Sequence, residues 1–176
     1  MRRLSLRMFA VVIAVLVASL AGGTANASAP PSDTGWQPVG TFDDLDFPGC
    51  GTTLTVHDVV NKVESRTLDD GRGNTLDLYR GKYIVRVSDT SGRKVVLDNS
   101  GPFSVATRSN GDNVVTVLPP ALIFPQNDSE PAAFQKAGLP DVFYYTKGIL
   151  NLVTKGGAER VATKPANPVN VCTLLR

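Results

Sequence analysis

Two cysteines, Cys50 and Cys172, are the residues of this 176-residue chain whose chemistry is easiest to state. A metal ion is a poor partner for them, because zinc takes three or four such ligands and the chain has a single histidine. In an oxidising compartment, one well-separated pair of cysteines most simply forms a disulfide bond. Closing so long a loop is expected to stabilise the fold by roughly 5 kcal/mol in the chain-entropy description.

The single histidine, His57, lies beside Asp58 in a segment whose Val and Thr content is typical of a strand. A histidine held by a carboxylate can act as the general base that activates a serine. Neighbouring residues of a strand point to opposite faces, so Asp58 is not expected to orient His57. No nucleophile motif accompanies the histidine. We therefore interpret His57 as a structural residue, and the sequence predicts no catalytic residue.

Clusters of carboxylates suggest two further kinds of site. An acidic run before Cys50 could bind calcium, but its spacing matches no calcium loop and favours a solvated turn. Its members are Asp43, Asp44 and Asp46. A pair of carboxylates could also cleave a glycosidic bond, although sixteen acidic residues make some suitable pair unavoidable. The candidates for such a pair are Asp58, Glu64, Asp77 and Asp98. Without a cleft to select among these residues, the sequence predicts neither a metal nor a cofactor.

Four tyrosines lie on segments that are expected to form long strands, and they are the candidates for lining a ligand cavity. They are Tyr79, Tyr83, Tyr144 and Tyr145. Aromatic side chains that point into a barrel can surround a small ligand. Packing in a filled core is the alternative, because small barrels usually fill their interior with side chains.

The first 27 residues are typical of a cleavable secretory signal. Arg2, Arg3 and Arg7 precede an apolar run over residues 8–20, and small residues follow as far as Ala27. We expect cleavage after Ala27 and a secreted or extracellular protein. The apolar run is shorter than the roughly 20 residues that span a bilayer, so no stable membrane insertion is expected after cleavage.

Charge and length restrict the partners of the mature chain. Beyond residue 27 there are fifteen basic and sixteen acidic residues, which gives a net charge of −1. A nearly neutral chain lacks the basic surface that nucleic acid requires, so we expect no nucleic-acid partner. The length fits one domain, and we expect a monomer whose partners the sequence does not specify.

Turn sequences divide the chain after Cys50 into seven to nine strands, which is typical of an antiparallel barrel or sandwich. The expected strands cover residues 54–63, 74–89, 94–98, 103–107, 114–118, 141–155, 159–163 and 169–174. A short helix is expected within residues 126–138, with Ser129 as its cap and Gly138 at its end. Residues 28–47 are expected to form a mobile N-terminal arm anchored by Trp36, before a domain over residues 48–176.

Glycines within two of these strands predict bends. Apolar residues alternate from Tyr83 to Val87, whereas Leu76 and Leu78 follow the opposite phase. Gly81 lies between the two phases, so we expect a bend there at which the inward face changes. Gly148 is a second possible bend, within the long strand expected over residues 141–155.

The predicted disulfide favours a closed arrangement of the sheet. Bridged cysteines have Cα atoms about 5.5 Å apart, so the first and last strands would be neighbours. If the other strands follow one another in order, that contact closes the sheet. We therefore expect a small antiparallel β-barrel, closed or nearly closed, with a β-sandwich as the alternative.

Five short motifs of turn residues and cysteines punctuate the chain. They are Pro48-Gly49-Cys50-Gly51, Ser88-Asp89-Thr90-Ser91-Gly92-Arg93, Asn99-Ser100-Gly101-Pro102, Gly138-Leu139-Pro140 and Asn170-Val171-Cys172-Thr173-Leu174. Together they resemble a group of small secreted actinobacterial proteins of unknown function, over nearly the whole mature chain. Relatives in that group often carry Asp where this chain has Asn170. The resemblance implies a secreted β-rich domain with paired cysteines, and it supplies no catalytic residue.

These observations favour a secreted, non-enzymatic module of the envelope or the extracellular space. The first alternative is a ligand-carrying barrel that binds a small apolar molecule, and the second is a secreted hydrolase. A filled interior would favour the module, and a large apolar cavity would favour the carrier. Convergence of His57 with a hydroxyl and a carboxylate would favour the hydrolase.

Overall fold

A computed structural model describes residues 29–176, which form an antiparallel all-β fold with one short α-helix. The predicted signal peptide and its cleavage site lie outside the described residues. The larger sheet has ten strands: β1 (Ser32–Asp33), β2 (Gln37–Pro38), β3 (Leu45–Gly49), β4 (Thr52–Asp69), β5 (Thr75–Asp89), β6 (Lys94–Asp98), β7 (Phe103–Thr107), β8 (Asn113–Val117), β11 (Leu150–Lys155) and β12 (Ala158–Thr163). The smaller sheet has three strands: β9 (Ala121–Ile123), β10 (Phe143–Tyr145) and β13 (Val169–Asn170). The helical elements are α1 (Glu130–Lys136) and the 3-10 helix η1 (Val171–Thr173).

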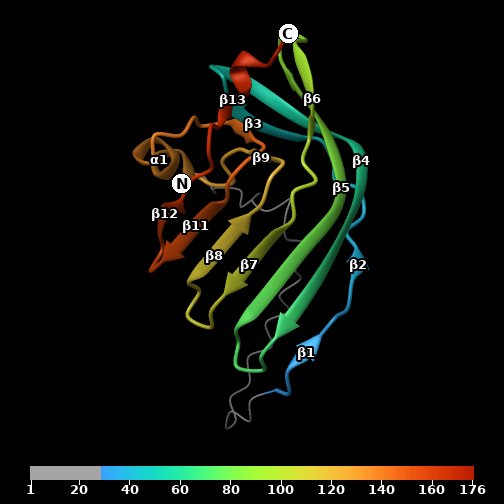
Figure 1. Cartoon of the computed structure of the whole chain (residues 1–176), viewed down its shortest axis with the longest axis vertical. Coiled ribbons are helices and arrows are strands. Elements are labelled where there is room, and N and C mark those ends of the chain that lie inside the picture. The colour runs from blue at the N-terminus through green and yellow to red at the C-terminus, as the bar shows by residue number, and fades with distance from the viewer. Residues whose placement is uncertain (1–28) are drawn as a thin grey trace, which may run out of the picture.

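A long hairpin of β4 and β5 runs along the molecule and organises the larger sheet (Figure 1). Its strands pair from Leu54 opposite Asp89 to Asp69 opposite Thr75. One half of the hairpin is flanked by β3 and β6. The other half is flanked by β1 and β2 on one side and by β7 on the other. The sheet then continues through β8, β11 and β12, so the two halves of the hairpin have different surroundings.

The strand β5 keeps the same face toward the interior along its whole length. Its buried residues are Asp77, Tyr79, Tyr83, Val85, Val87 and Asp89. The predicted change of face at Gly81 is therefore wrong. The change occurs in β4, where the register shifts between Asp58 and Val60 and Val59 is left as an extra, exposed residue. Gly81 serves a close approach instead, because a Cβ there would lie 2.1 Å from the carbonyl oxygen of Lys62.

The smaller sheet and α1 cover the inner face of the larger sheet. One group of buried apolar residues lies between the β3–β6 end of the larger sheet and the smaller sheet, and it includes Leu54, Val85 and Val171, each 0% exposed. A second group includes Phe134 of α1 and Leu150 of β11. The two layers are thus joined by two cores, one over the β4–β5 hairpin and one over β11 and its neighbours.

The long strand expected over residues 141–155 is divided between the two sheets. Residues 143–145 form β10 of the smaller sheet, and residues 150–155 form β11 of the larger sheet. Gly148 lies between them with φ of +91°, and a Cβ there would be 2.7 Å from the backbone nitrogen of Ala166. The predicted bend at Gly148 is therefore a crossing between layers, which only glycine accommodates at this backbone geometry.

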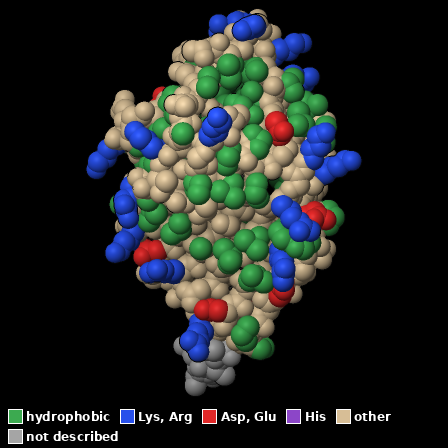
Figure 2. Space-filling model, in the orientation of Figure 1, with side chains coloured by type: hydrophobic (Ala, Val, Ile, Leu, Met, Phe, Trp, Pro, Cys, Tyr) green, Lys and Arg blue, Asp and Glu red, His purple; other side chains and the backbone are tan. Residues whose placement is uncertain are grey.

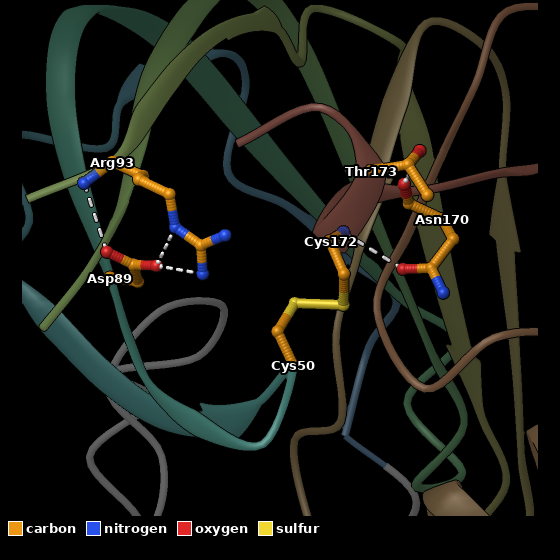
Figure 3. The surroundings of a disulfide bond; sticks show 6 residues. All are labelled: Cys50, Asp89, Arg93, Asn170, Cys172 and Thr173. Atoms are coloured by element: carbon orange, nitrogen blue, oxygen red, sulfur yellow. Dashed lines mark hydrogen bonds and ion pairs between the residues drawn. A yellow bond between two sulfur atoms is a disulfide. The ribbon is translucent and has the colours of Figure 1, made fainter. Parts of the chain in front are cut away.

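The predicted Cys50–Cys172 disulfide is confirmed, with Cα atoms 5.3 Å apart (Figure 3). Cys50 precedes β4, and Cys172 lies in η1, where its backbone N–H donates to the side chain of Asn170. The preceding strand, β13, pairs with β10 and not with the larger sheet. The bond thus joins the two sheets and not the two edges of one sheet. A disulfide requires only that its two cysteines lie close together, so their strands need not be neighbours in one sheet.

Closure of the larger sheet, expected from the disulfide, is not seen among the described strands. Their pairing order is open, from β1 and β4 at one side to β12 at the other. Antiparallel all-β architecture is confirmed, with a second layer of three strands over the first.

The described part of the N-terminal segment lies along β4, which differs from the mobile arm predicted for residues 28–47. Strands β1, β2 and β3 all pair with β4. Trp36 serves as the expected anchor, since the guanidinium of Arg80 lies 3.9 Å from its ring centroid. Asp58 accepts hydrogen bonds from the Phe42 backbone and from Asn61, which also donates to the carbonyl of Gly40. Strands of two residues carry no sequence period, so the pattern could not reveal them.

Figure 2 shows one face of the molecule, on which hydrophobic side chains form separate groups and Lys and Arg side chains project around the outline. The large apolar residues that stay exposed are Val59, Val96, Val114, Leu118, Ile149 and Val169. A mixed surface of this kind is typical of contact with water. Within residues 29–176, no helix has the length and apolar character needed to cross a membrane.

Candidate functional site: an apolar cavity with an acidic end

A cavity of about 310 Å³ lies between the inner face of the larger sheet and the cover formed by the smaller sheet and α1. Apolar side chains of the sheet line one side: Tyr79, Phe103, Val105, Val115, Val117 and Leu152. Apolar side chains of the cover line the other: Leu122, Ile123, Phe124 and Phe134. The volume falls at the lower end of the range of about 300–1,000 Å³ found for ligand pockets.

The strand register explains why these apolar side chains converge. Tyr79 lies opposite Phe103, and Phe103 lies opposite Val117 on β8. The rings of Tyr79 and Phe103 stack with centroids 4.1 Å apart. The next inward row across the same strands consists of Asp77, Val105, Val115 and Leu152. Facing residues of neighbouring strands point to the same side, so the apolar members of the two rows form one floor. Asp77, at the β5 end of the second row, accepts from Thr67 and does not line the cavity.

A third row makes one end of the cavity polar. Its members are Thr75, Thr107, Asn113, Thr154 and Glu159, of which the last three line the cavity. The chain segment that leads into α1 adds Gln126, Asn127 and Glu130 to the same end. The cavity therefore has an apolar body and an end that carries two glutamates.

Glu130 is the buried member of this pair, with 9% of its surface exposed. Its Oε2 accepts a hydrogen bond of 2.5 Å from the backbone N–H of Gln126. Burial raises the pKa of Glu130 to about 7, with the hydrogen bond from Gln126 opposing the rise and the charge of Glu159 adding to it. Near neutral pH this carboxyl group exchanges between its protonated and ionised forms.

Glu159 is held by donors from three residues. Its Oε1 accepts from Asn127 Nδ2 at 3.0 Å and from Thr154 Oγ1 at 3.5 Å, and its Oε2 contacts the hydroxyl of Ser129. Ser129 precedes α1 as predicted, but its side chain does not cap the helix. The side chain of Asn127 takes that place and accepts from the backbone N–H groups of Ser129 and Glu130. The helix start and the acidic end of the cavity are thus one hydrogen-bonded unit.

Among the described residues that line the cavity, Arg80 carries the positive charge. Its guanidinium, however, contacts residues outside the cavity. It belongs to the outward phase of β5, stacks on Trp36, and donates to Glu64 Oε2 at 3.1 Å. Its positive charge is therefore directed at the outer surface and the N-terminal segment.

Two of the four tyrosines predicted to line a cavity do so. Tyr79 and Tyr83 line it, and the hydroxyl of Tyr83 donates to Asp58 Oδ1 at 2.6 Å. Tyr144 and Tyr145 lie on β10, outside the set of lining residues. Tyr145 is buried and donates to the carbonyl of Val117, while Tyr144 packs against the first core. The difference follows from the crossing at Gly148, which moves both residues into the smaller sheet.

His57 lies away from the cavity, on the exposed side of β4. Its Nδ1 is 2.5 Å from Asp44 Oδ1, and both side chains are exposed. Asp58 points to the other face and bonds Tyr83, so it does not orient His57, as its strand position predicts. The pair of His57 and Asp44 has no buried hydroxyl partner among its described contacts. This arrangement agrees with a structural histidine.

The acidic candidates from the sequence do not gather at one place. Asp46 accepts from Thr55, Asp77 accepts from Thr67, and Glu64 pairs with Arg80. Within residues 29–176 no three His, Cys, Asp or Glu side chains are placed to hold a metal ion. The carboxylates that do share a cavity, Glu130 and Glu159, were not predicted, because they lie on elements whose contact is visible only in the fold.

A second hollow of about 570 Å³ lies at the end of β7, β8 and β11, around the hairpin turn over residues 108–112. It is more open to solvent than the apolar cavity, and polar or charged side chains such as Arg108, Asp112 and Lys155 line much of it. Enclosure and apolar lining are what small-molecule sites share, so the smaller cavity is the candidate site.

Comparisons with models of protein families, with curated proteins and with solved structures found no match for this chain. The resemblance to secreted actinobacterial proteins therefore stays a prediction. Any functional argument must begin from the cavity itself.

Proposed function

We propose that this protein is a secreted binding protein that carries one small, largely apolar molecule in the cavity. The observation that supports the proposal is the cavity, since a filled interior is what a purely structural module would have. In this proposal the curved larger sheet and its cover together enclose the ligand as the wall of a small barrel would. The predicted export signal ending at Ala27 and the disulfide are consistent with action outside the cytoplasm.

A hydrolase is the second candidate, and one observation favours it. Two carboxylates at one end of a cavity, one with a pKa raised to about 7, are an arrangement that glycoside hydrolases use. The lining opposes this candidate, because most of it is apolar and sugar hydroxyls need many polar partners. Turnover of nitrophenyl glycosides that is lost in Glu130→Gln would support the hydrolase instead of the carrier.

Binding of an uncharged, environment-sensitive naphthalene dye tests the carrier. We expect saturable binding of one dye molecule and a strong rise in fluorescence. Val115→Trp should abolish both, because the indole would occupy the apolar floor. Val114→Trp is the matched control, since Val114 precedes it on β8 but is 38% exposed on the other face.

Leu152→Phe is a second cavity-filling variant, to be used if Val115→Trp does not fold. It fills the same row with a smaller change in side-chain volume. A cooperative melting transition is required of each variant before its binding is interpreted. Absence of saturable dye binding to the parent chain, or equal binding to Val115→Trp and Val114→Trp, would refute the carrier proposal.

A further inference from the structure

We infer that the ligand of this cavity is an apolar molecule that ends in a protonated amine, and that Glu130 binds the amine. The inference rests on the proposed function and specifies the chemical class of the ligand. It follows from three features of the cavity: the distribution of charge, the incomplete hydrogen bonding of Glu130 and the size of the space.

Charge is distributed unevenly across the cavity. The charged residues in its lining are Arg80, Glu130 and Glu159. Arg80 faces Trp36 and lies on β5, whereas Glu159 lies on β12, four strand spacings away in the order of the sheet. At about 4.8 Å per spacing the two strands are roughly 19 Å apart along the sheet. The end of the cavity near α1 is therefore negative, with no cation of the lining directed toward it.

The two glutamates differ in how far their oxygens are satisfied. Both oxygens of Glu159 have donors, from Asn127, Ser129 and Thr154. Glu130 has a donor at Oε2 only, and within residues 29–176 no further hydrogen bond reaches its other oxygen. A buried carboxylate is costly unless it is paired and fully hydrogen-bonded. Glu130 is thus the group in this cavity that a ligand can complete.

An ammonium group supplies what Glu130 lacks. It brings a positive charge and three N–H donors, and the hydrogen bond from an ionised donor to a carboxylate is among the strong ones. A hydroxyl group would bring one donor without charge. A carboxylate at the end of a ligand would meet Glu130 and Glu159 and would be repelled by the ionised forms of both. The chemistry of the acidic end therefore favours a cation.

The size of the cavity limits the apolar part of the ligand. A volume of about 310 Å³ equals roughly ten water molecules at about 30 Å³ each in the liquid. A chain or ring system of about eight to ten heavy atoms fits such a space. Octylamine, 1-octanol and octanoate are therefore suitable test ligands, because they share one alkyl chain and differ in the end group.

Competition of these three compounds with the naphthalene dye, and calorimetry of each, tests the inference. At about pH 8 an alkylamine is protonated, since amines of this type have a pKa near 10. We expect octylamine to bind at least about tenfold more tightly than 1-octanol, and octanoate to bind most weakly. Glu130→Gln should bring the affinity for octylamine down to that for 1-octanol. Glu64→Gln is the matched control. It should leave the order of the three affinities and the ratios between them unchanged, because Glu64 does not line the cavity and lies on β4, away from the acidic end.

The outcomes separate the two proposals. If none of the three compounds competes with the dye or gives heat, the carrier proposal fails. If 1-octanol or octanoate binds as tightly as octylamine to the parent chain, the cavity binds apolar molecules but the inference of an amine is wrong. If Glu130→Gln keeps the preference for octylamine, Glu130 does not bind the amine. The comparison of ligands in the parent chain needs no variant, so a poorly folded Glu130→Gln protein would not prevent the test.

Discussion

Two buried carboxylates, one beside the disulfide and one at the cavity, show how differently these two regions are built. Asp89, near the disulfide, accepts from the backbone and guanidinium of Arg93 (Figure 3). It also accepts from the backbone and hydroxyl of Ser91. Glu130, at the cavity, accepts from the backbone of Gln126. The residues are almost equally exposed, at 8% and 9%.

The pKa values of the two groups move in opposite directions. The hydroxyl of Ser91, followed by Arg93 and backbone donors, holds the pKa of Asp89 below its usual value. Burial raises that of Glu130 to about 7. A carboxylate that the chain satisfies completely stabilises a turn, whereas one left incomplete beside a cavity is available to a ligand. We therefore expect the region of the disulfide to contribute more to stability, and the proposed function places ligand binding at the cavity.

Loss of the disulfide should have the largest effect and tests whether stability is concentrated at its end. Replacement of Cys50 and Cys172 by Ala is expected to lower the free energy of unfolding by about 3–5 kcal/mol, because the bond closes a loop with a sequence separation of 122. Denaturation by guanidinium, compared with the parent chain, measures the change. A loss below about 1 kcal/mol would show that the sheets hold together without the bond.

Replacing one valine of the filled core and one valine of the cavity wall by alanine tests whether the two regions are packed differently. Val85→Ala at the disulfide end is expected to cost about 2–3 kcal/mol, since Val85 is 0% exposed and its loss opens a new void. Val115→Ala is expected to cost about 1 kcal/mol, because Val115 already borders empty space. Urea denaturation of both variants measures the difference. Equal losses would mean that the cavity wall is packed as tightly as the core.

The pH dependence of stability should have opposite signs at the two carboxylates. The pKa of Glu130 rises from an ordinary 4.5 to about 7, so its favourable contribution is complete below pH 4.5 and is lost as the pH rises to about 7. Glu159 is the charged neighbour that adds to the rise. Relative to the parent chain, Glu130→Gln should therefore gain about 2 kcal/mol between about pH 5 and pH 8.

Asp89→Asn is the matched comparison. The pKa of Asp89 is lowered, so its contribution is present at neutral pH and is lost as the pH falls. The variant should be less stable than the parent chain at neutral pH, and the gap should narrow in acid. Melting temperatures of both variants across this range measure the effect. If melting temperature changes with pH in the same way for the parent chain and for Glu130→Gln, the raised pKa assigned to Glu130 is contradicted.

Local sequence signals predicted much of the strand pattern. Residues 94–98 and 103–107 form strands with the predicted bounds, because turn residues flank both segments. The short helix before Gly138 was predicted from local capping and turn residues. The disulfide was predicted from the number of cysteines and the expected compartment alone.

Features that depend on contacts between layers were missed. Gly148 divides an apparently continuous strand between two sheets, and this crossing removed Tyr144 and Tyr145 from the predicted cavity lining. The bulge at Val59 shifted the change of face from β5 to β4. Glu130 and Glu159 meet only because α1 packs beside β12, a contact that no local spacing encodes.

The sulfur bridge also determines how the cover over the cavity can move. It fastens the smaller sheet to the larger one near η1, whereas Glu130 and Glu159 lie on α1 and β12. The two cores and hydrogen bonds such as that from Tyr145 to the carbonyl of Val117 hold the cover elsewhere, so the layers are fastened along their contact and not at one point. In the proposed carrier, entry of a ligand would therefore require the cover to loosen away from the bridge, where non-covalent contacts hold it.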